Sequence, residues 1–256
     1  MRRSCSIDSS SSTEDEAAAF HFQDKTMHHE DIYTETPASP DTLANLGPLA
    51  PLAGTWYGAD GVDTHPVAEG TESEPFVETQ TYELLDPQNS GPQLLYGLRY
   101  HVAITKPGEL NAFHDQVGYL LWEPETETVF MTLAIPRAQV AMAVGKAKPG
   151  DKQIHLRAER GSTMNGIASN PFLEKNFRTE SWDITFTFNE DGSISYEEDT
   201  VLVIPGVEKK FHHTDKNTLR MIAAARPNPA MVQEGLVNNS RLKSKALLSP
   251  AKAGST

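Results

Sequence analysis

Polar and apolar residues alternate with a period of two along most of the chain between residues 54 and 222. Successive side chains of a β-strand point to opposite faces, so this period is typical of strands with one buried face. Turn residues such as Lys148-Pro149-Gly150-Asp151 separate the alternating segments. The pattern predicts strands at Gly54–Asp60, Phe76–Leu85, Gln93–Ile104, Ala112–Trp122, Val129–Ile135, Gln139–Val144, Gln153–Glu159, Phe177–Phe188, Ser193–Ile204 and Phe211–Ile222.

The segment Phe177–Phe188 indicates how these strands are arranged. Trp182, Ile184 and Phe186 share one face, and serine, threonine and aspartate residues occupy the other. About ten such strands exceed what a small barrel filled by side chains needs, so we expect a closed wall around a ligand cavity. The predicted fold class is all-β, an antiparallel up-and-down β-barrel of about ten strands.

The two ends of the chain differ in composition from this region. Residues 1–41 are rich in serine and acidic residues and poor in aliphatic ones, so they bury too little apolar surface to offset the entropy of ordering. We expect a disordered tail over 1–41, a barrel domain over 42–225 and a basic flexible tail over 226–256. A short helix is expected just after Asp41, which would be its N-cap, and another helical turn at 170–175.

The net charge and the cysteine content limit which binding partners and which cellular compartment are expected. The chain has 22 Lys+Arg against 35 Asp+Glu, a formal net charge of −13, which argues against nucleic acid as a partner. Cys5 is the one cysteine, so no intramolecular disulfide can form and an oxidising compartment is not needed. No apolar run approaches the roughly 18 residues of a membrane span, and the N-terminus lacks the apolar centre of a secretory signal. We expect a cytoplasmic protein.

The last predicted strand carries a histidine pair. Read in steps of two, one face of Phe211–Ile222 begins with phenylalanine and ends with Leu219 and Met221, which favours the interior. His213 lies on that face and His212 on the other. A buried imidazole is costly unless it is hydrogen-bonded or binds a metal. The residues alone leave both alternatives open for His213.

The acidic run Glu197-Glu198-Asp199 could suggest acid–base catalysis. Neighbouring strand residues face opposite ways, however, and such runs are usually solvated. We therefore expect this run to lie on the surface.

Several motifs resemble one family of barrels. The Gly-x-Trp motif at the first strand is similar to lipocalins and fatty-acid-binding proteins, and the fuller Gly54-x-Trp56-x-Gly58 resembles nitrobindin, the haem-binding barrel also found in a THAP-type protein. The resemblance spans roughly residues 49–221. Its other motifs are Thr64-His65-Pro66 at the family's Tyr-Pro-Thr element, Phe113-His114-Asp115-Gln116-Val117-Gly118-Tyr119 at its His-x-Glu-Thr-Gly-Tyr strand, and His213 seven residues before Arg220, as its proximal histidine precedes an arginine.

The resemblance implies a barrel that binds haem b, with His213 as the axial ligand of the iron. By the same carry-over, His65 would contact a haem face or propionate, His114 would lie near the cavity rim, and Trp56 would close the barrel floor. It implies five-coordinate iron with an apolar distal side, nitric oxide or peroxynitrite as the small ligand, and isomerisation of peroxynitrite to nitrate. No catalytic side chain is implied apart from the haem iron.

The chain departs from the family pattern at three places. Asp60 stands at a family glycine, Val67 replaces a threonine, and the segments 85–92 and 161–175 are longer than the family pattern. These departures bear on the haem edge and the open face of the cavity. The alternative function is a non-catalytic binding protein for a fatty acid or other small apolar ligand, with His213 as a polar handle. A homodimer is left open.

Overall fold

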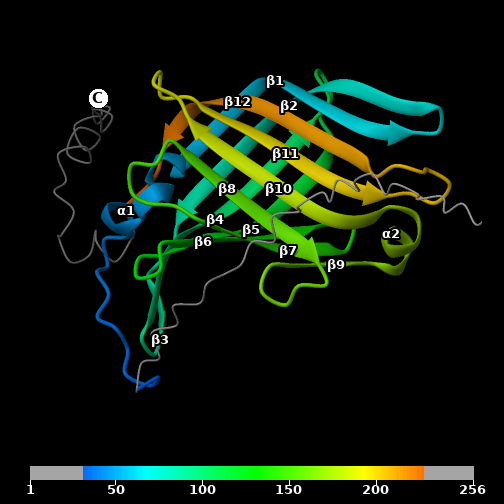
Figure 1. The fold of residues 1–256 in the computed structure, drawn as a ribbon. Helices are drawn as coiled ribbons and strands as arrows, with labels where there is room; N and C mark the ends of the chain where they lie inside the picture. The colour runs from blue at the N-terminus through cyan, green and yellow to red at the C-terminus, as the bar shows by residue number, and fades with distance from the viewer. Residues whose placement is uncertain (1–30, 228–256) are drawn as a thin grey trace, which may run out of the picture.

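The computed structural model describes residues 31–227, which form a β-barrel with short helices at its two ends (Figure 1). The helices are α1 (Thr42–Asn45), the 3-10 helix η1 (Gly47–Leu52) and α2 (Pro171–Asn176). The strands are β1 (Gly54–Val67), β2 (Gly70–Leu84), β3 (Gln88–Ser90), β4 (Gln93–Thr105), β5 (Ala112–Glu123), β6 (Thr128–Ile135), β7 (Gln139–Lys146), β8 (Gln153–Arg160), β9 (Gly166–Ser169), β10 (Arg178–Phe188), β11 (Ile194–Val203) and β12 (Phe211–Ala224).

Hydrogen bonding between strands closes the barrel. Around the ring the order is β1, β12, β11, β10, β8, β9, β7, β6, β5, β4 and β2, and β2 pairs back with β1. The first and last strands of the chain therefore lie side by side. The short β3 pairs with β4 and stands outside the ring. Closure leaves these eleven strands without an open sheet edge.

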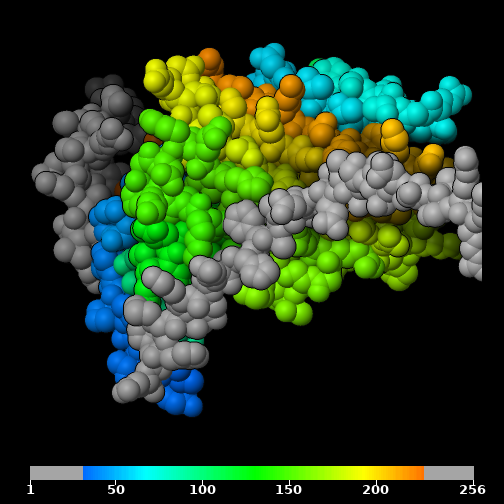
Figure 2. Space-filling model, in the orientation of Figure 1, coloured from blue at the N-terminus to red at the C-terminus, as the bar shows by residue number. Residues whose placement is uncertain are grey.

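The ring confirms the predicted barrel, with one difference in strand direction. Each of the ten predicted segments forms a strand, and the pairings are antiparallel except that β8 and β9 run parallel. The alternation pattern missed β3 and β9, because strands of three or four residues are too short to show a period. It also ended β1 at Asp60, whereas β1 and β2 continue as a hairpin that projects at one end of the barrel (Figures 1 and 2).

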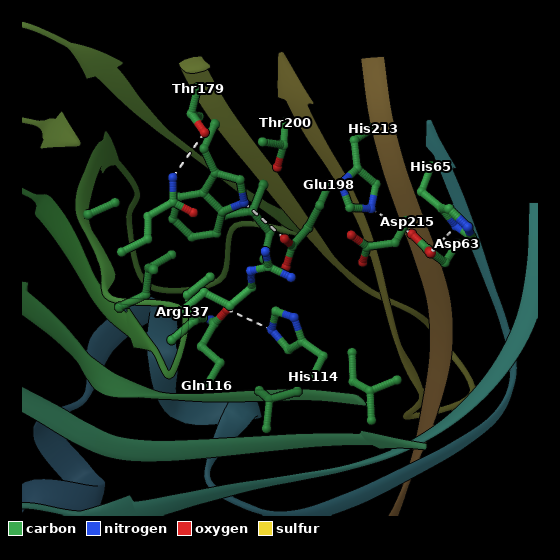
Figure 3. A pocket seen from close by; sticks show the side chains of 18 of the residues that line it. Asp63, His65, His114, Gln116, Arg137, Thr179, Glu198, Thr200, His213 and Asp215 are labelled. Atoms are coloured by element: carbon green, nitrogen blue, oxygen red, sulfur yellow. Dashed lines mark hydrogen bonds and ion pairs between the residues drawn. The ribbon is translucent and has the colours of Figure 1, made fainter. Parts of the chain in front are cut away.

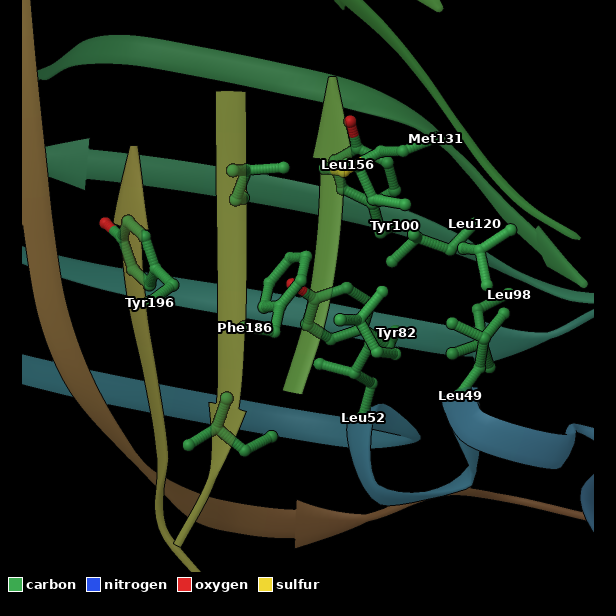
Figure 4. Close-up of a cluster of buried hydrophobic side chains, with 14 of the residues drawn as sticks. Leu49, Leu52, Tyr82, Leu98, Tyr100, Leu120, Met131, Leu156, Phe186 and Tyr196 are labelled. Atoms are coloured by element: carbon green, nitrogen blue, oxygen red, sulfur yellow. The ribbon is translucent and has the colours of Figure 1, made fainter. Parts of the chain in front are cut away.

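The opposite end of the barrel is closed by α1 and η1. The Asp41 side chain accepts a hydrogen bond from the Ala44 amide, which confirms the predicted N-cap. Leu46, Leu49 and Leu52 are fully buried against strand residues and form the floor of the barrel (Figure 4). Trp56 is buried with them, and its Nε1 donates to the Leu52 carbonyl at 2.8 Å. This packed floor leaves any cavity to the other half of the barrel.

Gly47 allows the floor to pack this closely. Its φ is +55°, and a Cβ atom there would lie 2.5 Å from the ring of Trp122. A side chain is excluded by both the conformation and the contact.

The predicted tails fall mostly outside the described residues, so they stay predictions. Within the described part, residues shortly before α1 contact the β3–β4 hairpin. The Thr36 amide donates to the Gly91 carbonyl at 3.2 Å, and the Ser39 amide donates to the Tyr96 hydroxyl at 3.0 Å.

Candidate functional site

A cavity of about 500 Å³ opens at the end of the barrel that carries the β1–β2 hairpin and α2. This volume is within the range of small-molecule and cofactor sites. Much of its wall is apolar or aromatic, including Val102, Met131, Leu133, Phe186 and Trp182. The segment 161–175, which the sequence identified as an insertion, contributes to the wall through Ile167 of β9 and Leu173 of α2, and the nearby Phe177 lines the wall as well. The insertion thus covers part of the cavity.

His213 and His212 lie on opposite faces of β12. His213 lines the cavity, and His212 is exposed and pairs with Asp199 at 2.7 Å. The two histidines therefore lie on the faces that the alternation predicts, whereas Met221, expected on the interior face, is exposed. About a third of the His213 side chain is exposed, so its ring stands toward the cavity mouth.

Asp63 of β1 holds the His213 ring (Figure 3). Its Oδ1 lies 2.7 Å from His213 Nε2, and its Oδ2 lies 2.7 Å from His65 Nδ1. The two imidazole ring centroids are 6.4 Å apart. One carboxylate thus links both histidines at the mouth. His65 also lines the cavity.

A bulge in β1 turns Asp63 and His65 inward. Before the bulge the even-numbered Trp56 faces the interior, and the register with β2 shifts by one residue between Gly58 and Gly61. After the shift the odd-numbered residues face inward. A Cβ on Gly61 would lie 2.3 Å from the Phe76 ring, so the bulge requires a residue without a side chain there.

The histidine and the carboxylate shift each other's pKa. Burial alone would lower the pKa of His213, but the hydrogen bond and charge of Asp63 outweigh it, so the pKa of His213 is raised. Burial acts to raise the pKa of Asp63, yet His213 and His65 outweigh it and the pKa of Asp63 is lowered. Each charged form therefore stabilises the other.

His114 of β5 faces the cavity from the wall opposite β12 (Figure 3). Its Nε2 lies 3.4 Å from Gln116 Oε1, and the Gln116 amide donates to the Tyr100 hydroxyl at 2.9 Å. Burial lowers the pKa of His114, and the nearby charge of His213 lowers it further. A neutral imidazole thus lies across the cavity from His213.

The expectation that the run Glu197-Glu198-Asp199 lies on the surface is wrong for its middle residue. Glu197 is exposed, but Glu198 lines the cavity, and its Oε2 accepts a hydrogen bond from Trp182 Nε1 at 2.9 Å. Glu198 lies in phase with the buried Ile194 and Tyr196 of β11. The two-residue spacing from Ile194 and Tyr196 was the feature of the sequence that could have placed Glu198 inside.

Asp215 of β12 is the direct cross-strand partner of Glu198 and also lines the cavity. Burial is the main cause that raises the pKa of Glu198 to about 7, although the Trp182 hydrogen bond opposes it. Burial and the charge of Glu198 raise the pKa of Asp215 well above its ordinary value. Two facing carboxyls in this setting resist carrying two negative charges.

A buried polar network lies deeper in the barrel. Glu78 of β2 is almost fully buried and accepts hydrogen bonds from Gln80 at 2.7 Å, Asn217 at 2.8 Å and the Tyr196 hydroxyl at 2.9 Å. Burial raises the pKa of Glu78. Three donors satisfy this carboxyl, which is what a buried polar group requires.

Two basic side chains line the mouth. Lys106, at the end of β4, forms an ion pair with Glu74 at 2.7 Å, and Arg137 lies exposed in the β6–β7 turn. Within residues 31–227, no group of three or more His, Cys, Asp or Glu side chains has the arrangement of a metal-ion site.

The fold and cavity define a ligand-binding β-barrel with a histidine aimed into its hollow. The model of the THAP4-like, heme-binding beta-barrel domain family matches residues 45–221, well over half of the chain. The chain belongs to this family.

The crystal structure of Rv2717c from M. tuberculosis is similar to this chain, with a TM-score of 0.50 and 20% sequence identity. The similarity covers 72% of this chain and 99% of that one, and at this identity it shows the fold alone. A comparison with curated proteins found no match. Of the helices that the structure describes, none has the length and apolar character to cross a membrane.

Replacing Glu198 with glutamine should stabilise the protein at alkaline pH. A carboxyl with a raised pKa loses folding stability as pH rises from its ordinary value, 4.5, to its folded value, about 7. Glu198→Gln stays neutral and keeps an acceptor for Trp182, so we expect it to exceed the wild type by about 2–3 kcal/mol at pH 8 and to match it near pH 4. Urea denaturation of the hemin-free protein measures the difference.

The matched control is Glu197→Gln, which removes a charge from the exposed neighbour on the same strand. It should leave the pH profile of stability unchanged. If the free energy of unfolding of Glu198→Gln changed with pH in parallel with that of the wild type, the raised pKa of Glu198 would be contradicted.

Proposed function

We propose that this barrel binds haem b through His213 and presents the iron to nitric oxide or a related small ligand. The observation that carries the proposal is an imidazole aimed into a cavity of about 500 Å³ in a member of a haem-binding family. A second proposal follows from the same resemblance, that ferric haem in this site isomerises peroxynitrite to nitrate. The protein would then act as an isomerase.

The walls of the cavity suit a large, flat, mainly apolar ligand with an acidic edge. Val102, Met131 and Leu133 offer apolar contact, and Lys106 and Arg137 at the mouth are cations that can pair with propionates. His65 lies at the same mouth, consistent with its proposed contact with a haem face or propionate. These residues fit the group that the family binds.

Asp63 would orient the axial imidazole. In the structure its Oδ1 engages Nε2 of His213, and Nδ1 has no hydrogen-bond partner among the described side chains, so an iron bound to one ring nitrogen would leave the other nitrogen for Asp63. A carboxylate on the second nitrogen of a metal-bound histidine fixes the ring and raises its basicity. Asp63 is therefore proposed as the residue that positions His213.

His114 and Gln116 would shape the space for the small ligand. The lowered pKa of His114 keeps its imidazole neutral at physiological pH, so it can donate or accept one hydrogen bond without adding charge. Bound haem supplies an iron centre that takes nitric oxide or peroxynitrite. The protein's own contribution is the axial imidazole, the polarity of the pocket and the partial cover by α2.

The alternative, a carrier for a fatty acid, has weaker support. Asp63, Glu198 and Asp215 line the cavity, and a carboxylate ligand near them would be repelled. We also propose a cytoplasmic location, because the chain has one cysteine and needs no disulfide.

Hemin titration of the purified protein tests the axial ligand. We expect a Soret band in the wild type and a loss of hemin affinity of at least about 100-fold in His213→Ala, because the iron loses its one protein ligand. The control is His212→Ala, which removes the exposed neighbour and should bind hemin like the wild type. Full hemin occupancy in His213→Ala would overturn the proposal.

The variant Asp63→Asn tests the positioning of the imidazole. The variant keeps the shape of the side chain but removes the negative charge that Asp63 places beside His213, so hemin affinity should fall by about 10–100-fold. Glu197→Gln, which removes a charge from an exposed position of β11, should have no effect. Unchanged affinity in Asp63→Asn, with the fold verified by circular dichroism, would show that Asp63 does not support the ligand.

The isomerisation is tested by the nitrate yield from peroxynitrite. Hemin-loaded wild type should speed the decay of peroxynitrite and raise the share that becomes nitrate, relative to hemin-free protein. Stopped-flow absorbance and ion chromatography measure the two quantities. Equal decay with and without hemin would exclude this activity while leaving haem binding intact.

A further inference from the structure

The paired carboxyls of Glu198 and Asp215 are not explained by haem binding. Both lie on the cavity wall, two residue pairs from Thr200 and His213 along β11 and β12 and closer to the floor (Figure 3). Trp182 donates to one oxygen of Glu198. Among the described residues, Asp215 has no hydrogen-bond or ion-pair partner, although it is enclosed by the barrel and faces the cavity. Burying a carboxylate without a partner costs folding free energy unless a ligand or a proton neutralises its charge.

No cationic side chain of the described residues forms an ion pair or hydrogen bond with Glu198 or Asp215. His213 pairs with Asp63, and Lys106 pairs with Glu74 at the mouth. Arg137 is exposed in its turn. The nearby charge of His213 favours the ionised form of Asp215, but neither carboxyl has a direct cationic partner in the described part of the chain.

Aromatic rings surround the same region. Trp182 and Phe186 of β10 and Tyr196 of β11 line the cavity on strands next to the carboxyls, and Phe76 and Tyr82 of β2 line it as well. The faces of aromatic rings attract cations, and ammonium groups are commonly bound among several rings. Carboxylates and aromatic faces together favour a cation that also has an apolar body.

We propose that the inner part of the cavity is a binding site for an organic cation, with an ammonium group at Glu198 and Asp215 and an apolar or aromatic body against Trp182 and its neighbours. The site shares the cavity proposed for haem, so a bound porphyrin and the cation would compete for it, but its contacts are Glu198, Asp215 and the aromatic rings rather than His213. An anionic ligand would be repelled by the same carboxyls. A bare metal ion would find two carboxyls and no further group of ligands in the described residues.

Benzyltrimethylammonium and its uncharged carbon analogue neopentylbenzene test the proposal as a matched pair. The two probes have the same shape and differ by the positive charge. We expect hemin-free, full-length protein at pH 8 to bind the cation at least about tenfold more tightly, since the charge meets carboxylates and ring faces in a partly desolvated site. Quenching of tryptophan fluorescence and isothermal titration calorimetry measure both affinities.

Three variants locate the site. Asp215→Asn and Glu198→Gln should each weaken binding of the cation by about tenfold and leave neopentylbenzene unchanged. Glu197→Gln, on the outer face of the same strand, should leave both affinities unchanged. Equal affinity of the wild type for the two probes, or equal loss of cation binding in Glu197→Gln, would overturn the proposal. No hemin is added, so the outcome is independent of the haem experiments.

Discussion

The pairing of β12 with β1 is the constraint on which the site depends. It joins residues from the two ends of the barrel domain, closes the ring and places Asp63 opposite Asp215 in the register. Asp63 and His213, 150 positions apart in the chain, then meet at 2.7 Å. Without this pairing the imidazole would have neither its orientation nor its carboxylate, and the cavity would have no continuous wall.

The barrel divides its interior between two kinds of packing. At the floor, buried leucines and Trp56 form a close-packed core with few polar groups. Between the floor and the mouth, the interior contains Glu78, Glu198 and Asp215, whose burial shifts each pKa upward. Such groups reduce folding stability unless a partner or a proton neutralises them. A well-packed floor can offset that cost, a common arrangement when a scaffold carries a binding site.

Much of the fold was accessible from the sequence, and less of the site. Alternation with period two located ten strands and placed His213 inside and His212 outside, because one strand face is buried and the other is not. Asp63 escaped this reasoning because the bulge between Gly58 and Gly61 reverses which residues face inward. Glu198 was missed because three acids in a row suggested solvent. The alternation of side chains along one strand does not show which strand pairs with it or in which direction, so the parallel pair of β8 and β9 was not predicted.

The most direct test of the account is a crystal structure of the protein grown with hemin. The account predicts a porphyrin in the cavity with its iron bonded to the imidazole of His213, while Asp63 accepts a hydrogen bond from the other ring nitrogen. A porphyrin held by a different side chain, or a cavity that stays free of porphyrin while His213 remains paired with Asp63, would contradict it.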